Sequence, residues 1–346
     1  MTSSAGASGS ASGFAEAATG RSNAGAVVTR LFGWIMLAVM AAFVFNNYLT
    51  YWQDFPGVAP LFGGAANGDP NTMLSLAQVG IYGILAALAA AYVLRDPGQA
   101  LRADSRRIVA INSFLIRGAF FAVLIVGLSD AVISYLRVEG MLEGLVGEAM
   151  ATDLGRSQFR GPYVHMPLIA LSFVLAAFTR TIGFMWLALL VVAAEFLIVI
   201  GRFIFSYEQA FMADLVRFWY AALFLFASAY TLWDEGHVRV DVFFAAMSAR
   251  TKGLVNAVGS LLMGIVLCWT ILIIGLGGKQ NAINAPMLSY ETTQAGFGLY
   301  VKYLMAGFLG VFAVSMLIMF TAYLLEAVAD IREEPGGRDV ASSAAH

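Results

Sequence analysis

The sequence predicts an all-α integral membrane protein, a polytopic bundle of about eight transmembrane helices, and its composition gives two reasons. Charged residues make up 12% of the 346-residue chain, about half of the roughly 25% found in ordinary soluble domains. Hydrophobic residues make up 60%, which leaves too few polar side chains to coat a water-soluble globule. The net charge of −2 argues against binding to nucleic acid, and the single cysteine, Cys268, cannot form an internal disulfide.

Eight apolar stretches are the third reason. Most reach the roughly 20 residues that a helix needs to cross the hydrocarbon of a bilayer. They lie near residues 31–48, 73–94, 108–136, 163–178, 182–205, 215–233, 254–276 and 297–328. The fourth stretch has only 16 residues. A seven-helix protein, with a re-entrant or interfacial segment at 163–178, is therefore the alternative.

The distribution of positive charge decides between these alternatives, because Lys and Arg accumulate in cytoplasmic loops. With eight spans and a cytoplasmic N-terminus, 12 of the 20 basic residues fall in cytoplasmic segments, four in outer segments and four within helices. With seven spans, seven basic residues would be inside and nine outside. The charge distribution therefore favours eight helices with both termini in the cytoplasm.

The remaining segments are predicted to be tails and loops. Residues 1–26 are rich in Ser, Ala and Gly and have no apolar core, so we expect a disordered tail rather than a signal peptide. Residues 332–346 form a second flexible tail. Loop 50–72 contains three prolines and predicts irregular structure, whereas apolar residues at near-helical spacing predict an amphipathic helix within loop 137–162.

No catalytic, metal or cofactor site is predicted. The three histidines, His165, His237 and His346, are expected to lie away from the middle of any helix, which argues against haem ligation within the membrane. The sequence has no cluster of metal ligands, no nucleophile motif with a partner base and no phosphate-binding loop. We therefore expect a protein that is not an enzyme.

Charged residues within the apolar stretches are the candidate functional residues, since such groups are costly in lipid and normally have a partner. Glu195 and Arg202 stand seven apart, on one helical face. Asp214 and Arg217 are three apart, close enough for an ion pair. These charges, with Arg117 and Asp130, could form a partner-facing surface, an ion path or an internal network that only fixes helix packing. Asp130 repeats the seven-residue spacing with Arg137, so a degenerate duplication is a further alternative.

Part of the sequence resembles the small membrane subunit, DctQ type, of tripartite ATP-independent periplasmic (TRAP) transporters. The resemblance is carried by the runs 219–232 and 236–241, by the arginine and aromatic residues at 202–205, and by 248–250. It covers residues 182–331, and its usual four helices match the last four apolar stretches. The chain thus divides into an additional four-helix membrane region at 27–180 and a DctQ-like four-helix region at 181–331. The extra region is one departure from the family. Another is that Glu208 and Asp214 stand where the family often has a Trp and paired acids.

The resemblance implies a scaffold subunit of the bacterial inner membrane. Such a subunit would support a large permease subunit (DctM type) in sodium-gradient-driven uptake of an organic anion, usually a carboxylate, delivered by a periplasmic binding protein. Membrane lipid is the other expected partner. The residues expected to set scaffold geometry and partner contact are Arg202, Glu208, Asp214, Arg217, Gly236, His237, Arg239 and Asp241. A self-sufficient carrier or channel that uses Arg117, Asp130, Glu195 and Arg202 is the rival reading.

Overall fold

The computed structural model describes residues 24–180, 184–207, 209–233, 242–293 and 298–337. Within these residues there are helices and connecting segments and no strand. Eight helices are long and apolar enough to cross a membrane. The prediction of an all-α membrane bundle with eight spans rather than seven is therefore confirmed.

The first four spans cover residues 24–178. They are α2 (Ala24–Trp52), α3 (Thr72–Arg95), α4 (Leu101–Val138) and a fourth span at Ser157–Phe178. The fourth span has 22 residues, because α7 (Ser157–Arg160), a π-helical turn η2 (Gly161–His165) and α8 (Met166–Phe178) follow one another without a break. The helix α2 begins inside the segment predicted as a tail. The rest of that segment, residues 1–23, lies outside the described residues.

The last four spans are α9 (Phe184–Ile204), α10 (Ala210–Trp233), a composite span at Ala249–Leu276 and α15 (Lys302–Ile331). The composite span joins α12 (Ala249–Gly259), a second π-helical turn η3 (Ser260–Ile265) and α13 (Val266–Leu276). Short helices occupy the connections: η1 (Ala59–Phe62), α5 (Leu142–Val146), α6 (Glu148–Leu154), α11 (Val242–Ala245) and α14 (Asn284–Ser289). The helix predicted within loop 137–162 is thus present as the two short helices α5 and α6.

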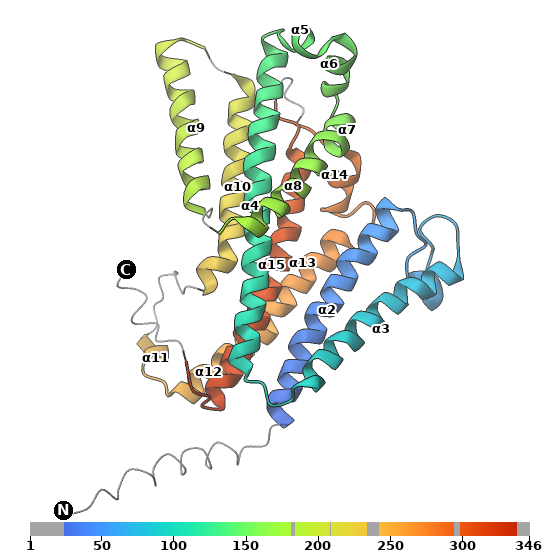
Figure 1. Ribbon diagram of the computed structural model, residues 1–346, viewed down its shortest axis with the longest axis vertical. Helices are drawn as coiled ribbons and strands as arrows, with labels where there is room; N and C mark the ends of the chain where they lie inside the picture. The colour runs from blue at the N-terminus through green and yellow to red at the C-terminus, as the bar shows by residue number, and fades with distance from the viewer. Residues whose placement is uncertain (1–23, 181–183, 208, 234–241, 294–297, 338–346) are drawn as a thin grey trace, which may run out of the picture.

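The helix α15 lies at the centre of the bundle and packs against α2, α4, α10 and the composite span (Figure 1). It is the most deeply buried span, whereas α3 and α9 are the most exposed. A helix that is apolar on all sides is expected either in a core or in contact with lipid. The chain uses both positions, with α15 in the protein core and α3 and α9 at the periphery.

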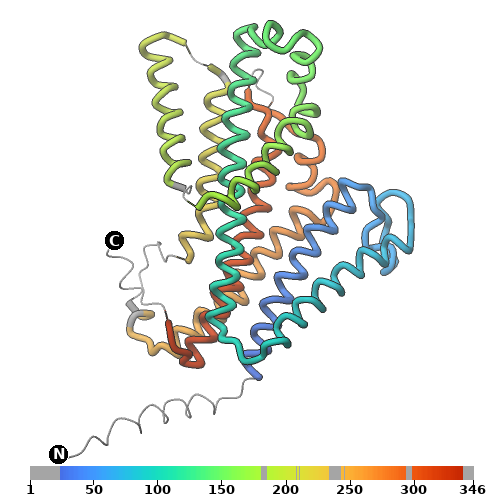
Figure 2. The backbone as a smooth tube through the Cα atoms, viewed as in Figure 1, coloured from blue at the N-terminus to red at the C-terminus, as the bar shows by residue number. Residues whose placement is uncertain are grey.

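The extra amino-terminal helices are packed into the same bundle as the last four. The long helix α4 runs beside α15 and α10, and α8 packs against α4 (Figure 2). One apolar core joins α4, α9, α10 and α15, and a second joins α2, α4, α12, α13 and α15. The two predicted regions, 27–180 and 181–331, therefore share both cores.

Candidate functional site

A buried polar cluster, which we call the Asp130 cluster, joins α4, the fourth span and α15. Asp130 accepts hydrogen bonds from Arg160 Nη1 at 2.7 Å and, through its second oxygen, from the backbone N–H of Tyr300 at 2.7 Å. The ring of His165 lies with Nε2 3.1 Å from Asp130 and Nδ1 2.8 Å from the hydroxyl of Tyr303. The side chains of Asp130, Arg160 and His165 are fully buried.

Both ring nitrogens of His165 have a hydrogen-bond partner when the imidazole is neutral. With its proton on Nε2, the imidazole donates to Asp130 and accepts from Tyr303, and this assignment follows from the network. Arg160 then neutralises Asp130, and its guanidinium also lies 4.4 Å from the centre of the Tyr300 ring. The cluster carries no net charge in this state, as a buried structural network requires.

The π-helical turn η2 explains how Arg160 and His165 reach the same carboxylate. Residues five apart fall on different sides of an α-helix, but a π-helical turn closes hydrogen bonds between residues five apart. The N–H of Met166 donates to the carbonyl of Gly161 in this way. Gly161 is required at this turn, because a Cβ atom there would lie 2.1 Å from the ring of Tyr290.

The expectation that no histidine lies near the middle of a helix was wrong for His165, which is buried and is the ninth of the 22 residues of the fourth span. Arg160 falls in the predicted outer loop 137–162, and its role in the cluster was not predicted. The signal was present in the spacing of Arg160, Gly161, Pro162 and His165 directly before an apolar run. α-Helical periodicity could not interpret that spacing, because the turn is not α-helical.

Two further buried ion pairs lie at the opposite end of α4 and were also missed. Arg30 of α2 donates to Asp104 at 2.7 Å, and both side chains are fully buried. Arg102 contacts Glu326 at 2.5 Å and Asp330 at 2.7 Å on α15. These pairs tie the amino-terminal helices α2 and α4 to one another and to the last span.

Glu195 and Arg202 lie on the exposed surface of α9, where α9 packs mainly against α10. Within the described part of the chain neither side chain has a hydrogen bond or ion pair. Glu195 is near the middle of α9, so it cannot reach the headgroups as easily as Arg202, which is in the last turn. A carboxylate at this depth costs several kcal/mol against lipid, and a polar partner would remove that cost.

Asp214 and Arg217 form the local ion pair that their spacing predicts, at 3.4 Å. Asp214 also accepts a hydrogen bond from Thr293 at 3.2 Å, which links the first turns of α10 to the segment before α15. The Arg217 side chain is 70% exposed, so its pair with Asp214 is expected to add little stability.

On the outer loops, Tyr207 donates a hydrogen bond to Glu139. This bond raises the pKa of Tyr207, because it favours the neutral phenol beside a carboxylate. The contact joins the segment after α9 to the segment after α4. It is a further link between the two predicted regions.

The four charges of the rival carrier hypothesis occupy separate surroundings. Arg117 donates to the carbonyl of Thr179 at 3.2 Å, and Asp130 belongs to the buried cluster described above. Glu195 and Arg202 are exposed on α9. No ion pair or hydrogen bond joins any two of these four across residues 24–180 and 184–207. Of the remaining predicted site residues, Glu208, Gly236, His237, Arg239 and Asp241 lie outside the described residues.

Eight apolar spans and charge pairs buried between them define a multi-pass helical membrane protein. No group of three or more metal-ligating side chains occurs among the described residues. Residues 190–333 match the family model for the DctQ component of tripartite ATP-independent periplasmic transporters. The match spans the second half of the bundle, from within α9 to the end of α15, and the four amino-terminal spans lie outside it. The DctQ family is one of transporter components. No curated protein and no solved structure was found to match the chain.

Proposed function

We propose that the chain is the small membrane subunit of a TRAP transporter in a bacterial inner membrane. It acts as a fixed scaffold for a large permease subunit, which carries out sodium-gradient-driven uptake of an organic anion, a carboxylate by class, received from a periplasmic binding protein. The observation that carries this proposal is the match of residues 190–333 to DctQ components. The substrate and ion sites belong to the large subunit.

The exposed face of α9 is the proposed docking surface for the large permease. It belongs to the DctQ-matching region, and it carries an intramembrane carboxylate, Glu195, with no partner within the described residues. A permease helix with a hydrogen-bond donor or cation opposite Glu195, and an acceptor opposite Arg202, would satisfy both groups. Of the four extra helices, α4 packs on the other side of α10 and the rest lie beyond it, so they leave most of α9 open (Figure 1).

Replacing Glu195 by leucine is expected to break the complex while leaving the isolated chain as stable as before. Truncating one partner of a buried charge pair typically costs about 2–5 kcal/mol of binding energy, so we expect at least a tenfold loss of affinity. Recovery of the large permease with an affinity-tagged chain, solubilised together in mild detergent, measures the effect. Arg202→Leu should act in the same direction.

Arg95→Leu is the matched control, because it also removes an exposed arginine from a helix end, on α3. It should leave recovery of the permease unchanged. Equal recovery for all three variants would exclude α9 as the docking surface. Uptake by vesicles that contain the chain alone, without permease and binding protein, would instead favour a self-sufficient carrier.

The proposed orientation, with both termini cytoplasmic, can be tested with single cysteines. The only native cysteine, Cys268, is buried and can be replaced by serine, which leaves no native thiol for the maleimide to label. Asp69→Cys and Gly98→Cys place thiols in exposed loops at opposite ends of α3. In intact spheroplasts, a membrane-impermeant maleimide should label position 69 and not position 98. The reverse pattern would invert the topology.

A further inference from the structure

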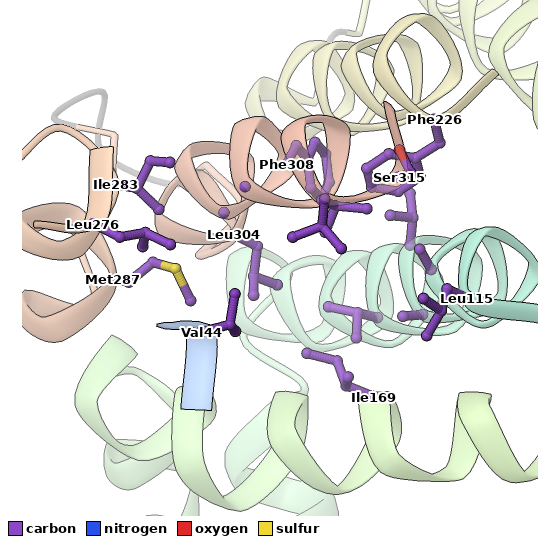
Figure 3. A pocket seen from close by; sticks show the side chains of 18 of the residues that line it. Val44, Leu115, Ile169, Phe226, Leu276, Ile283, Met287, Leu304, Phe308 and Ser315 are labelled. Carbon is purple, nitrogen blue, oxygen red and sulfur yellow. The ribbon is translucent and has the colours of Figure 1, made fainter. Parts of the chain in front are cut away.

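A cavity of about 450 Å³ lies inside the bundle, between the amino-terminal helices and α15. Its walls include Leu115 of α4, Ile169 of α8 and Phe308 of α15 (Figure 3). Val44 of α2 and Met287 of α14 stand on its other sides. The cavity is thus built from both the extra helices and the DctQ-matching part of the chain.

The wall of the cavity offers little to a polar ligand. It has no charged side chain, and the amide nitrogens of its two asparagines are already used. Asn47 and Asn284 both donate to the carbonyl of Leu276, and the hydroxyl of Ser315 donates to the carbonyl of Phe312 at 3.0 Å. A site that holds water or an ion needs several available polar partners. This cavity is therefore suited neither to water nor to a transported anion.

The cavity opens sideways, between α2 and α8. The helix α2 packs mainly against α3 and α15, and α8 packs mainly against α4, so α2 and α8 are not packed against one another along their length. Val44 and Tyr48 line the α2 side of this opening and are 38% and 46% exposed. Both belong to a membrane-spanning helix. The opening is therefore continuous with the surface that faces hydrocarbon.

We propose that this cavity is a binding site for one acyl chain of a membrane phospholipid. An empty cavity forfeits the dispersion contacts of its lining atoms, and the solvent at its mouth is already hydrocarbon. Its volume is about three times that of the roughly 150 Å³ apolar cavity known to hold one benzene. A partner helix, about 10–12 Å across with its side chains, is too wide to enter. This proposal is independent of the proposed function.

The lipid headgroup is placed at the end of α2 where the chain leaves the membrane. Tyr48 and Trp52 line that end of the cavity, and these residue types are enriched at the membrane–water interface. The phospholipid therefore belongs to the leaflet on the side of α14, with one chain inserted between α2 and α8.

Photo-crosslinking in nanodiscs tests the proposal. The full chain is reconstituted in phosphatidylethanolamine and phosphatidylglycerol with a trace of phospholipid that carries a diazirine on its acyl chain. Adducts located by mass spectrometry are expected on Met287 and Phe308 in the wild type. Gly310→Leu fills the cavity, since a Cβ atom there meets only Ile283, at 3.9 Å, and should reduce these adducts at least fivefold.

Gly83→Leu is the matched control, because it adds the same side chain to α3, where a Cβ atom meets nothing within 4 Å. It should leave the cavity adducts unchanged. Val44→Trp is a second test, because it places a bulky side chain at the opening of the cavity. It should cause the same loss of adducts while the inner wall stays unchanged. Wild-type protein without cavity adducts, cavity adducts that persist in both variants, or their loss when the large permease is bound would each overturn the proposal.

Discussion

Asp130→Leu is expected to lower the free energy of unfolding by about 3–5 kcal/mol, the usual effect of removing one partner of a buried ion pair. The variant leaves the guanidinium of Arg160 fully buried without its carboxylate. It also removes the acceptors of His165 and of the Tyr300 backbone. Denaturation of the purified protein in mixed detergent micelles measures the change. Because total stability of a domain is only about 5–15 kcal/mol, a low yield of folded protein is expected as well.

A second variant separates the ion pair from general damage to the core. Asp130→Leu combined with Arg160→Met removes both charges, and an apolar replacement of a buried pair is often close to neutral. The double variant should therefore be more stable than Asp130→Leu alone. Arg217→Ala, which breaks an exposed ion pair, should cost less than about 1 kcal/mol. If the double variant is no more stable than Asp130→Leu, the ion pair between Asp130 and Arg160 does not account for the loss of unfolding free energy.

Gly253→Leu is expected to have the second large effect, because it lies where α12 crosses α15. A Cβ atom at Gly253 would come 2.7 Å from the backbone oxygen of Ala327. Small residues allow this close approach between transmembrane helices, and the backbone cannot move aside as a side chain could. We expect a loss of about 3 kcal/mol or more, above the usual range for overpacking, measured by the same denaturation assay.

Gly259→Leu is the matched control on the same helix. A Cβ atom at Gly259 meets nothing within 4 Å. Leucine ranks just below alanine as a helix former, whereas glycine is about 0.8–1.0 kcal/mol less favourable than alanine. Gly259→Leu should therefore be neutral or slightly stabilising. If both variants are equally stable, α12 and α15 are not in close contact.

The spans could be predicted from the sequence because their signal is local. The length and apolarity of each stretch are enough to identify a spanning helix, and even the doubtful fourth stretch was recovered from the placement of Lys and Arg. The extra length of that span could not be predicted. Four of its first five residues, Ser157, Gln158, Arg160 and Gly161, are polar or small, and Arg160 is accommodated there because it has a buried partner.

The buried charge pairs could not be predicted, because each joins residues that are distant in sequence. Asp130 and Arg160 are 30 residues apart, and Arg102 and Glu326 are 224 apart. The spacing of residues along the sequence predicts partners only within one helix, and it correctly predicted the ion pair between Asp214 and Arg217. They say nothing about which helices will lie side by side. An alignment of related sequences, in which such pairs vary together, is the kind of information that could have found them.

The position of α15 has a consequence for the way the chain matures. This helix, which packs against α2, α4, α10 and the composite span, is the last of the eight spans to be synthesised. While it is still on the ribosome, the earlier helices can enter the bilayer and form local pairs such as α2 with α3. The apolar surface of α4 that will pack against α15 meanwhile faces lipid, and Arg102, at the start of α4, lacks its carboxylate partners. The bundle is therefore completed only after α15 has been inserted, and a chain cut before Lys302 would leave Arg102 without the carboxylates of Glu326 and Asp330.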